Sequence, residues 1–351
     1  MLLIFLACTG SEKPEDTAPT ETSPIGVGDG SPESVGWTSI LDGNDDLTDP
    51  RDLGFDEDGR LWVANREDDA TFTINAPGTD AQENERRVDP YAMHFMEETA
   101  AFSFDGNGQF GSCGESRNTY NGQSTPNDYS GPVLWTTNLD IFANVDPIGL
   151  GSHLDMLHES PNCVGIAWES DNIYWVFDGR NSNIVRYDFQ GDHGPGMDDH
   201  SDGIVRRLTE VEVSFERDAP GHMVIDHDTG LLYVADTGNG RVLWIDTASG
   251  DEGGRLDASD PGVKHREWDG ADWGVLVEGL DKPGGIALGD GRLFVGEWGT
   301  GVIFEFDLDG TEIRSLDTGF GAEALHGIEL GPDGQLWVVD NGAAAVFRID
   351  P

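Results

Sequence analysis

One phrase of about fifteen residues recurs along this chain, and it constrains the fold more than any other feature of the sequence. Its clearest copies begin at Gly284 and His326 and read GGIALGDGRLFVGEW and HGIELGPDGQLWVVD. Three further copies begin at Arg51, Val164 and His222, and a degenerate copy begins at Ala100. Neighbouring copies are about 40 to 65 residues apart, so the chain is built from repeats of one supersecondary unit.

Each copy predicts a pair of short strands. An alternating apolar run leads into an Asp-Gly or Pro-Asp-Gly turn, which supplies the positive φ that a tight hairpin needs. A second apolar run follows, and further runs such as residues 240–246 and 273–279 supply a third and a fourth strand. Four antiparallel strands form one blade of a β-propeller, in which blades pack face to face and leave only short edges. The six copies therefore predict an all-β, six-bladed propeller over residues 36–351.

The two ends of this region indicate how the ring closes. The last copy stops after a third apolar run, residues 345–350, with no fourth run behind it. A strand-like segment, residues 36–41, precedes the first copy and has no other partner in the repeat. We expect this N-terminal strand to pair with the C-terminal blade and complete it.

The repeated phrases resemble the NHL-repeat family of six-bladed propellers. Among these, the sequence is distantly similar to the peptidyl-hydroxyglycine amidating lyases, in which histidines at the start of three inner strands hold a zinc ion. The matching positions are His222 and His326, and Arg66 matches a catalytic arginine of that family. The sequence departs from the pattern at Ala100, where the third histidine is expected, and at Arg180, near which a catalytic tyrosine is expected.

The repeat also predicts which polar residues meet at the central pore. The start of each inner strand and the turn after each second strand lie on one face, which we call the top face. Candidate catalytic residues there are Arg66, Glu115 and Arg180. Neutral imidazole is a preferred ligand for Zn²⁺, so His222 and His326 are candidate metal ligands, with hydrogen-bonded structural histidines as the alternative. The loop histidines His158, His153 and His94 are candidates for a third ligand, or they are solvated.

A second candidate cation site lies in the acidic loop 191–203. Its carboxylates Asp198, Asp199 and Asp202 are hard oxygen donors of the kind that Ca²⁺ prefers. The loop should lie on the face opposite the pore ligands, because it connects a third strand to a fourth. A solvated acidic loop without an ion is the alternative.

The N-terminus indicates export. Residues 1–7 are apolar, and the Leu-Ala-Cys ending at Cys8 resembles a bacterial lipobox. This resemblance implies cleavage before Cys8, a lipid anchor, and a place in the cell envelope, with Thr9 favouring the outer membrane. Residues 9–35 are rich in Pro, Glu, Ser and Thr and predict a disordered acidic tether. With Cys8 lipidated, Cys113 and Cys163 remain as a candidate disulfide or as two separate buried thiols.

The charge of the chain limits its partners. The formal net charge is −47, from 67 acidic and 20 basic side chains. Nucleic acid and anionic membrane surfaces would be repelled, so we expect membrane contact only through the lipid anchor. No nucleotide- or flavin-binding motif is present, and we expect a monomer. Two functions remain: a module that binds a small molecule, peptide or protein on its top face, or a metal-dependent lyase or hydrolase with a divalent metal at the pore.

Overall fold

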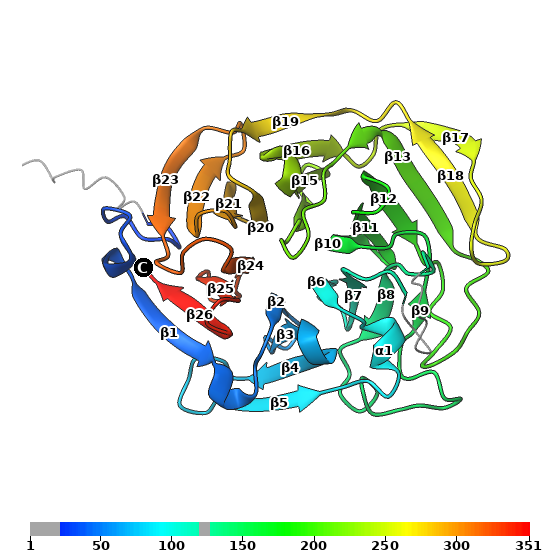
Figure 1. The fold of residues 1–351 in the computed structure, drawn as a ribbon, viewed down its shortest axis with the longest axis horizontal. Coiled ribbons are helices and arrows are strands. Elements are labelled where there is room, and N and C mark those ends of the chain that lie inside the picture. Colours follow the sequence, from blue (N-terminus) through cyan, green and yellow to red (C-terminus); the bar gives the residue numbers. More distant parts are fainter. Residues whose placement is uncertain (1–21, 119–126) are drawn as a thin grey trace, which may run out of the picture.

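The computed structural model describes residues 22–118 and 127–351, and six sheets are arranged around one central axis (Figure 1). This arrangement confirms the predicted six-bladed propeller. Its only α-helix in the described ranges is the single turn α1 (Ala92–Phe95). No helix among these residues is long and apolar enough to cross a bilayer.

Each blade is built on four strands, and in blades one to five the strand nearest the axis comes first in sequence. Blades one to three contain β2 (Pro50–Phe55), β3 (Leu61–Asn65), β4 (Ala70–Asn75) and β5 (Glu83–Arg87); β6 (Thr99–Phe104), β7 (Gln109–Gly114), β8 (Val133–Thr136) and β9 (Asp155–Met156); and β10 (Cys163–Ser170), β11 (Ile173–Asp178), β12 (Asn183–Asp188) and β13 (Ile204–Glu212). Blades four to six contain β14 (Met223–Asp226), β15 (Leu231–Asp236), β16 (Arg241–Asp246) and β19 (Trp273–Glu278); β20 (Pro283–Gly289), β21 (Arg292–Glu297), β22 (Val302–Asp307) and β23 (Glu312–Asp317); and β24 (Leu325–Leu330), β25 (Leu336–Asp340), β26 (Ala345–Asp350) and β1 (Gly36–Leu41).

The ring closes as the sequence predicted. Strand β1 pairs antiparallel with β26, so that Gly36 lies opposite Asp350 and Ser39 opposite Phe347. The outer strand of blade six is therefore the first strand of the chain, and the inner three are the last. The ladder between them joins the two ends of the propeller.

The cores lie between the blades, where apolar side chains of neighbouring sheets meet. The second strand of each blade is buried over most of its length. The indole rings of Trp62 in β3, Trp175 in β11 and Trp135 in β8, the third strand of blade two, are almost fully enclosed. Cys113 of β7 and Cys163 of β10 form a disulfide between blades two and three. This bond confirms one of the two alternatives that the sequence left open for the cysteine pair.

Residues 22–35, which the sequence assigned to the tether, lie against blades five and six instead. Ile25 is buried in the apolar cluster shared by these blades, and the Ser23 hydroxyl donates to Glu305 Oε2 at 2.5 Å. The folded part of the chain therefore begins before Trp37. Cys8 and the rest of the predicted tether lie outside the described residues.

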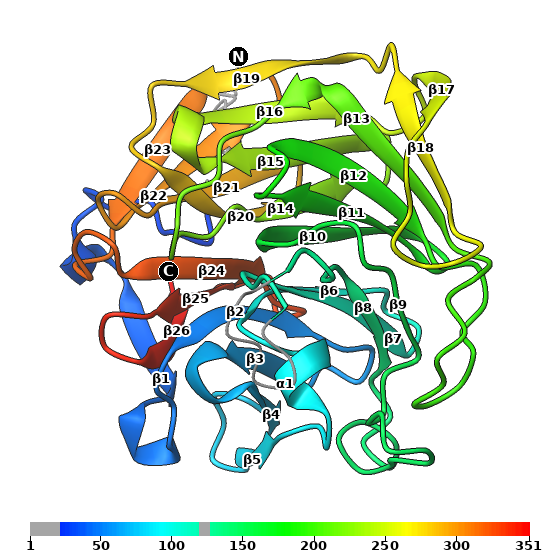
Figure 2. The same cartoon turned by 45° about the vertical axis from the view of Figure 1, so that its right-hand side comes forward.

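Blade four carries an insertion that the repeat did not predict. The hairpin of β17 (Asp251–Arg255) and β18 (Lys264–Asp269) leaves blade four after β16 and extends the sheet of blade three (Figure 2). Strand β18 runs parallel to β13, with Lys264 opposite Ile204. The sheet of blade three thus has six strands, and the hairpin covers the outer edge of β13.

Candidate functional site

Two buried arginines lie at the top of the central pore. Arg51 belongs to β2 and Arg66 follows β3, and each residue is 8% exposed. Arg66 Nη1 donates to Asp218 Oδ1 at 2.8 Å, and Arg51 Nη1 donates to the Asp218 carbonyl oxygen at 2.7 Å. Asp218 lies in the connection between blades three and four. These contacts therefore tie blade one to a distant part of the ring across the top of the pore.

Glu115 completes this group. Its Oε2 lies 3.4 Å from Arg66 Nη1, and its Oε1 accepts a hydrogen bond of 2.9 Å from the backbone N–H of Asp218. Burial raises the pKa of Glu115, and the hydrogen bond from Arg66 lowers the pKa of Asp218. Of the three predicted catalytic residues, the structure brings Arg66 and Glu115 together. Arg180 is separate, with a side chain 46% exposed and 3.6 Å from Asp128.

His222 immediately precedes the inner strand β14, and His326 lies in the inner strand β24. His222 Nε2 is 3.2 Å from the Ala100 carbonyl oxygen, and its Nδ1 is 3.5 Å from Asp52 Oδ1. His326 Nε2 accepts a 3.2 Å hydrogen bond from Trp298 Nε1. Burial lowers the pKa of His326 well below its usual value, so this ring is neutral. Both Nε2 atoms already have hydrogen-bond partners, which agrees with the alternative that these are hydrogen-bonded structural histidines.

No third donor joins these two histidines in the described part of the chain. Only one group there brings three His, Cys, Asp or Glu donor atoms within 4.8 Å of one another, and it lies elsewhere. The predicted third ligands His158, His153 and His94 do not reach the pore. His153 and His158 flank β9, the outermost strand of blade two. His94 lies in α1, and the centroid of its ring is 5.8 Å from that of the His158 ring. The repeat could not show this, because these residues lie in insertions outside it.

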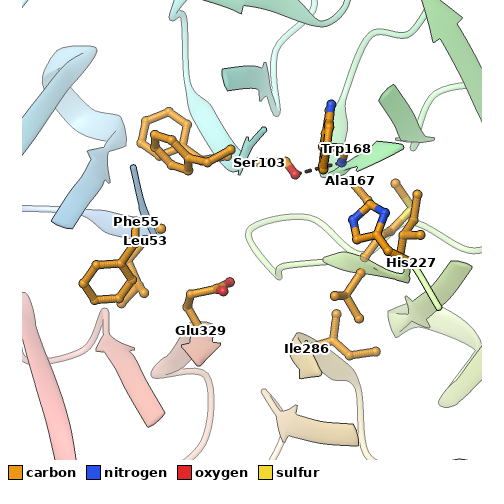
Figure 3. Close-up of a pocket in the computed structure, with 14 residues that line it drawn as sticks. Leu53, Phe55, Ser103, Ala167, Trp168, His227, Ile286 and Glu329 are labelled. Atoms are coloured by element: carbon orange, nitrogen blue, oxygen red, sulfur yellow. Dashed lines mark hydrogen bonds between the residues drawn. The ribbon is translucent and has the colours of Figure 1, made fainter. Parts of the chain in front are cut away.

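Below the histidines the pore widens into a cavity of about 250 Å³, which we call the lower channel (Figure 3). Inner strands of all six blades contribute to its wall. Most of the lining is apolar, including Leu53, Phe55, Phe102, Phe104, Trp168, Ile225 and Ile286. Exposure rises towards the bottom face, where His227 is exposed. The lower channel therefore opens on the face opposite the arginines.

Glu329 of β24 is the only acid in this lining, and its carboxyl group points into the cavity (Figure 3). Burial raises the pKa of Glu329 to about 8, and the nearby Asp52 adds to the increase. No hydrogen bond from the described residues reaches this carboxyl group, so the channel holds an acid that is mostly neutral at pH 7. The sequence contained a signal for it. The equivalent positions in the other repeats are small or apolar, at Gly54, Ser103, Ala167, Ile225 and Ala287.

A second polar cluster lies on the outer flank, between blades two and three. His200 from the acidic loop donates or accepts through Nδ1 at 2.6 Å from Asp155 Oδ1, and His158 Nδ1 is 2.9 Å from Asp260 Oδ2. His153 Nδ1 is 3.0 Å from the Leu150 carbonyl oxygen. Burial lowers the pKa of His153 to about 3, so its ring is neutral.

The predicted calcium ligands do not gather in the described structure. Asp202 approaches His193, with 3.0 Å between its Oδ1 and His193 Nε2, and both join Asp155 in the one three-donor group mentioned above. Asp198 and Asp199 are exposed and outside this group. The Asp199 carboxylate instead accepts a hydrogen bond from the backbone of Ser201. The Asp199 carboxylate, which we predicted to bind a cation, is therefore engaged in a local turn.

Comparisons with known proteins support the fold. No protein-family model matches the sequence, and no curated protein matches it. The structure is similar to a virginiamycin B lyase from Staphylococcus aureus, with a TM-score of 0.53 and 13% identity over 90% of this chain and 99% of that chain. It is also similar to a protein of unknown function from Bacteroides thetaiotaomicron (TM-score 0.55, 10% identity, 90% and 72% covered) and to the calcium-binding protein regucalcin from Agrobacterium tumefaciens (0.51, 14%, 86% and 90%). At these identities the likeness shows the fold alone.

Proposed function

We propose that this propeller is a binding module and that its ligand is a small organic cation held in the lower channel. The observation that carries the proposal is the Glu329 carboxyl group, which faces a cavity lined mainly by apolar side chains, with Ser103 and His227 as the other polar ones (Figure 3). An ammonium group beside this carboxyl group stabilises the ionised carboxylate and donates a charge-assisted hydrogen bond to it. A buried acid of raised pKa in a pocket is a marker of a functional site.

The wall and the charge of the protein fit the same ligand class. Phe55, Phe104 and Trp168 line the lower channel and offer surface for an apolar ligand body, and aromatic faces also attract cations. The cavity of about 250 Å³ restricts the ligand to a small molecule. The net charge of −47 concentrates cations around the protein and disfavours anions.

We propose that the ligand enters the lower channel from the bottom face. The sequence-based prediction placed the ligand on the top face, but there the ion pairs of Arg66 with Asp218 and Glu115 lie across the pore. An NHL-type relationship, export and a lipid anchor at Cys8 remain part of the proposal. The disulfide between Cys113 and Cys163 supports an oxidising compartment.

A calorimetric titration with benzylammonium ion tests the proposal. We expect binding by the unchanged chain and a loss of about 10- to 100-fold in affinity for Glu329→Gln, because a hydrogen bond to a charged group is removed. Glu312→Gln is the matched control, since Glu312 is exposed on β23. Binding at pH 7 should also release a proton from Glu329, which titrations in buffers of different ionisation enthalpy detect.

Two outcomes would contradict the proposal. Binding of benzoate or benzyl alcohol as tightly as benzylammonium would show that the cavity does not select a cation. Equal affinities of the Glu329→Gln and Glu312→Gln variants would show that Glu329 is not the anchor.

A further inference from the structure

The acidic loop between β12 and β13 is tied to the outermost strand of blade two. The backbone N–H of Gly196 donates to the His153 carbonyl oxygen at 2.7 Å, and that of His193 reaches the Leu154 carbonyl oxygen at 3.4 Å. These contacts hold a loop of blade three against the segment that leads into β9 of blade two. Side chains from the two segments therefore meet at one place on the flank of the propeller.

Three donor atoms meet there. His193 Nε2 lies 3.0 Å from Asp202 Oδ1 and 4.0 Å from Asp155 Oδ2, and all three atoms are within 4.8 Å of one another. No other His, Cys, Asp or Glu side chains within residues 22–118 and 127–351 gather three donors so closely. Ligands about 2.1 Å from a tetrahedral Zn²⁺ ion lie about 3.4 Å apart. The two distances from His193 Nε2 lie on either side of this value, so small rotations of the side chains bring the three atoms to one ion.

Asp155 supplies the observation that points to a ligand. Its Oδ1 atom already has partners, because it lies 2.6 Å from His200 Nδ1 and accepts a 2.7 Å hydrogen bond from the backbone N–H of Met156. Its Oδ2 atom is buried and has no hydrogen-bond partner among the described residues, and Asp155 as a whole is 1% exposed. A buried carboxylate oxygen without a partner is costly. The group is therefore incomplete without a further partner for Oδ2.

An ion pair between His193 and Asp202 explains only part of this arrangement. It satisfies His193 Nε2 and Asp202 Oδ1, which lie at an ordinary hydrogen-bond distance. It leaves Asp155 Oδ2 at 4.0 Å from the imidazole, which is too far for a hydrogen bond. A cation among the three atoms satisfies all of them. The side chains of His193 and Asp202 are 24% and 42% exposed, so an ion can reach them from solvent.

We propose that Asp155 Oδ2, His193 Nε2 and Asp202 Oδ1 bind one divalent transition-metal ion, such as Zn²⁺, between blades two and three. Imidazole and carboxylate are both zinc ligands, and zinc sites with three protein ligands keep a fourth position for water. The imidazole disfavours Ca²⁺ and Mg²⁺, which take oxygen ligands. His200 is then a positioning residue, because its hydrogen bond to Oδ1 orients the Asp155 carboxylate.

This site differs from the calcium site that the sequence predicted in the same loop. Asp202 belongs to both, but Asp198 and Asp199 are exposed and lie outside the group. Two of the ligands, Asp155 and His193, come from outside the predicted set of carboxylates, and Asp155 comes from another blade. The site is also independent of the lower channel, which lies among the inner strands. The two proposals can therefore fail separately.

Zinc titration of the purified chain, after treatment with a chelator, tests the site. Physiological salt and excess Mg²⁺ suppress weak binding to the many surface carboxylates. We expect one equivalent of Zn²⁺ to bind, and Ca²⁺ not to displace it. Binding should be lost in His193→Ala and in Asp155→Asn. Asp198→Asn is the matched control, because it removes an exposed carboxylate of the same loop from outside the group.

His200→Ala tests the positioning role. We expect Zn²⁺ affinity to fall about 10- to 100-fold, because an orienting hydrogen bond is lost. The visible absorption of the Co²⁺-loaded protein should stay unchanged, because the ligands themselves remain. A changed Co²⁺ spectrum in His200→Ala would show that His200 is itself a ligand and would overturn the assignment.

Other outcomes also decide against the site. Absence of Zn²⁺ binding by the unchanged chain would overturn the proposal, and displacement of Zn²⁺ by equal Ca²⁺ would overturn the choice of a transition metal. Equal Zn²⁺ affinities of His193→Ala and Asp198→Asn would show that the ion binds elsewhere. Loss of binding in a folded His222→Ala/His326→Ala variant would place it at the pore. Circular dichroism shows whether each variant is folded, and the partly exposed His193 keeps the test decisive if the buried Asp155→Asn variant is not.

Discussion

At the scale of single residues, Glu329 has a strongly shifted ionisation, because it lies in a cavity lined mainly by apolar side chains. A carboxyl group in an apolar channel keeps its proton, because the channel solvates the charged form poorly. The pKa of Glu329 is accordingly raised to about 8. The sequence identified the inner-strand position of this residue, but only the structure shows that the lower channel leaves a cavity in front of it.

Replacement of Glu329 by Gln should change how stability depends on pH. In the unfolded chain the carboxyl ionises near the ordinary pKa of 4.5, and in the folded protein it ionises near 8. The free energy of unfolding of the unchanged protein therefore falls as the pH rises from about 4.5 to 8. The Glu329→Gln variant should not show this contribution to the fall, because glutamine does not ionise. We expect the variant to be more stable at pH 8 by on the order of 2 to 5 kcal/mol and equal below pH 4.

Urea unfolding at several pH values measures this difference. Glu312→Gln, which removes an exposed acid from β23, is the control for the loss of one negative charge. A constant difference between Glu329→Gln and the unchanged protein across the pH range would show that Glu329 titrates normally.

Arg66 provides a second prediction at this scale. Its removal leaves Glu115, which is 3% exposed, without its cation and frees the Asp218 carboxylate. We expect Arg66→Ala to reduce the free energy of unfolding by about 1 to 3 kcal/mol. Arg180→Ala should change it by less than about 0.5 kcal/mol, because Arg180 is half exposed. Chemical denaturation of both variants decides the matter, and equal losses would contradict a role for the ion pairs at the top of the pore.

At the scale of strands, the sequence predicted what depends on local chemistry. The first two strands of each blade follow from alternating apolar residues joined by a short turn, and both strands are present in all six blades. The turn contains Asp-Gly in blades one, two, five and six, Asp171-Asn172 in blade three and Asp228-Thr229-Gly230 in blade four. The insertions were not predictable in this way. The hairpin β17–β18 takes its position from pairing with β13 of blade three, and the loops on either side of β9 lie outside the repeated phrase, so His158 could be recognised as a candidate ligand but not placed.

Strand β1 gives a prediction about ring closure. Ile40 is 4% exposed and packs in the cluster between blades six and one. Ile40→Ala should reduce stability by about 2 to 4 kcal/mol, through lost burial and a cavity at the seam. Val275→Ala in β19 is the control, since Val275 is 37% exposed on the outer strand of another blade. Guanidinium unfolding that gave similar midpoints for both variants would mean that β1 contributes little to closure.

At the scale of the whole molecule, the acidic excess opposes compaction. The net charge of −47 on the whole chain produces self-repulsion, which the folded state concentrates. Salt screens such repulsion beyond a Debye length of about 10 Å at 0.1 M.

We therefore expect the thermal unfolding midpoint to rise as sodium chloride increases from about 0.05 M to about 1 M. Differential scanning calorimetry measures this trend. A midpoint that stayed constant or fell over this range would show that local ion pairs, such as that of Arg66 with Asp218, outweigh the general repulsion.

The hairpin β17–β18 has a consequence for the modularity of this repeat protein. It grows out of blade four but hydrogen-bonds to blade three, so no boundary separates these blades without breaking a ladder. Repeats that share strands in this way cannot be duplicated, deleted or exchanged singly, either by recombination during evolution or by a designer. Blades three and four should therefore be inherited, grafted and mechanically pulled apart as one unit.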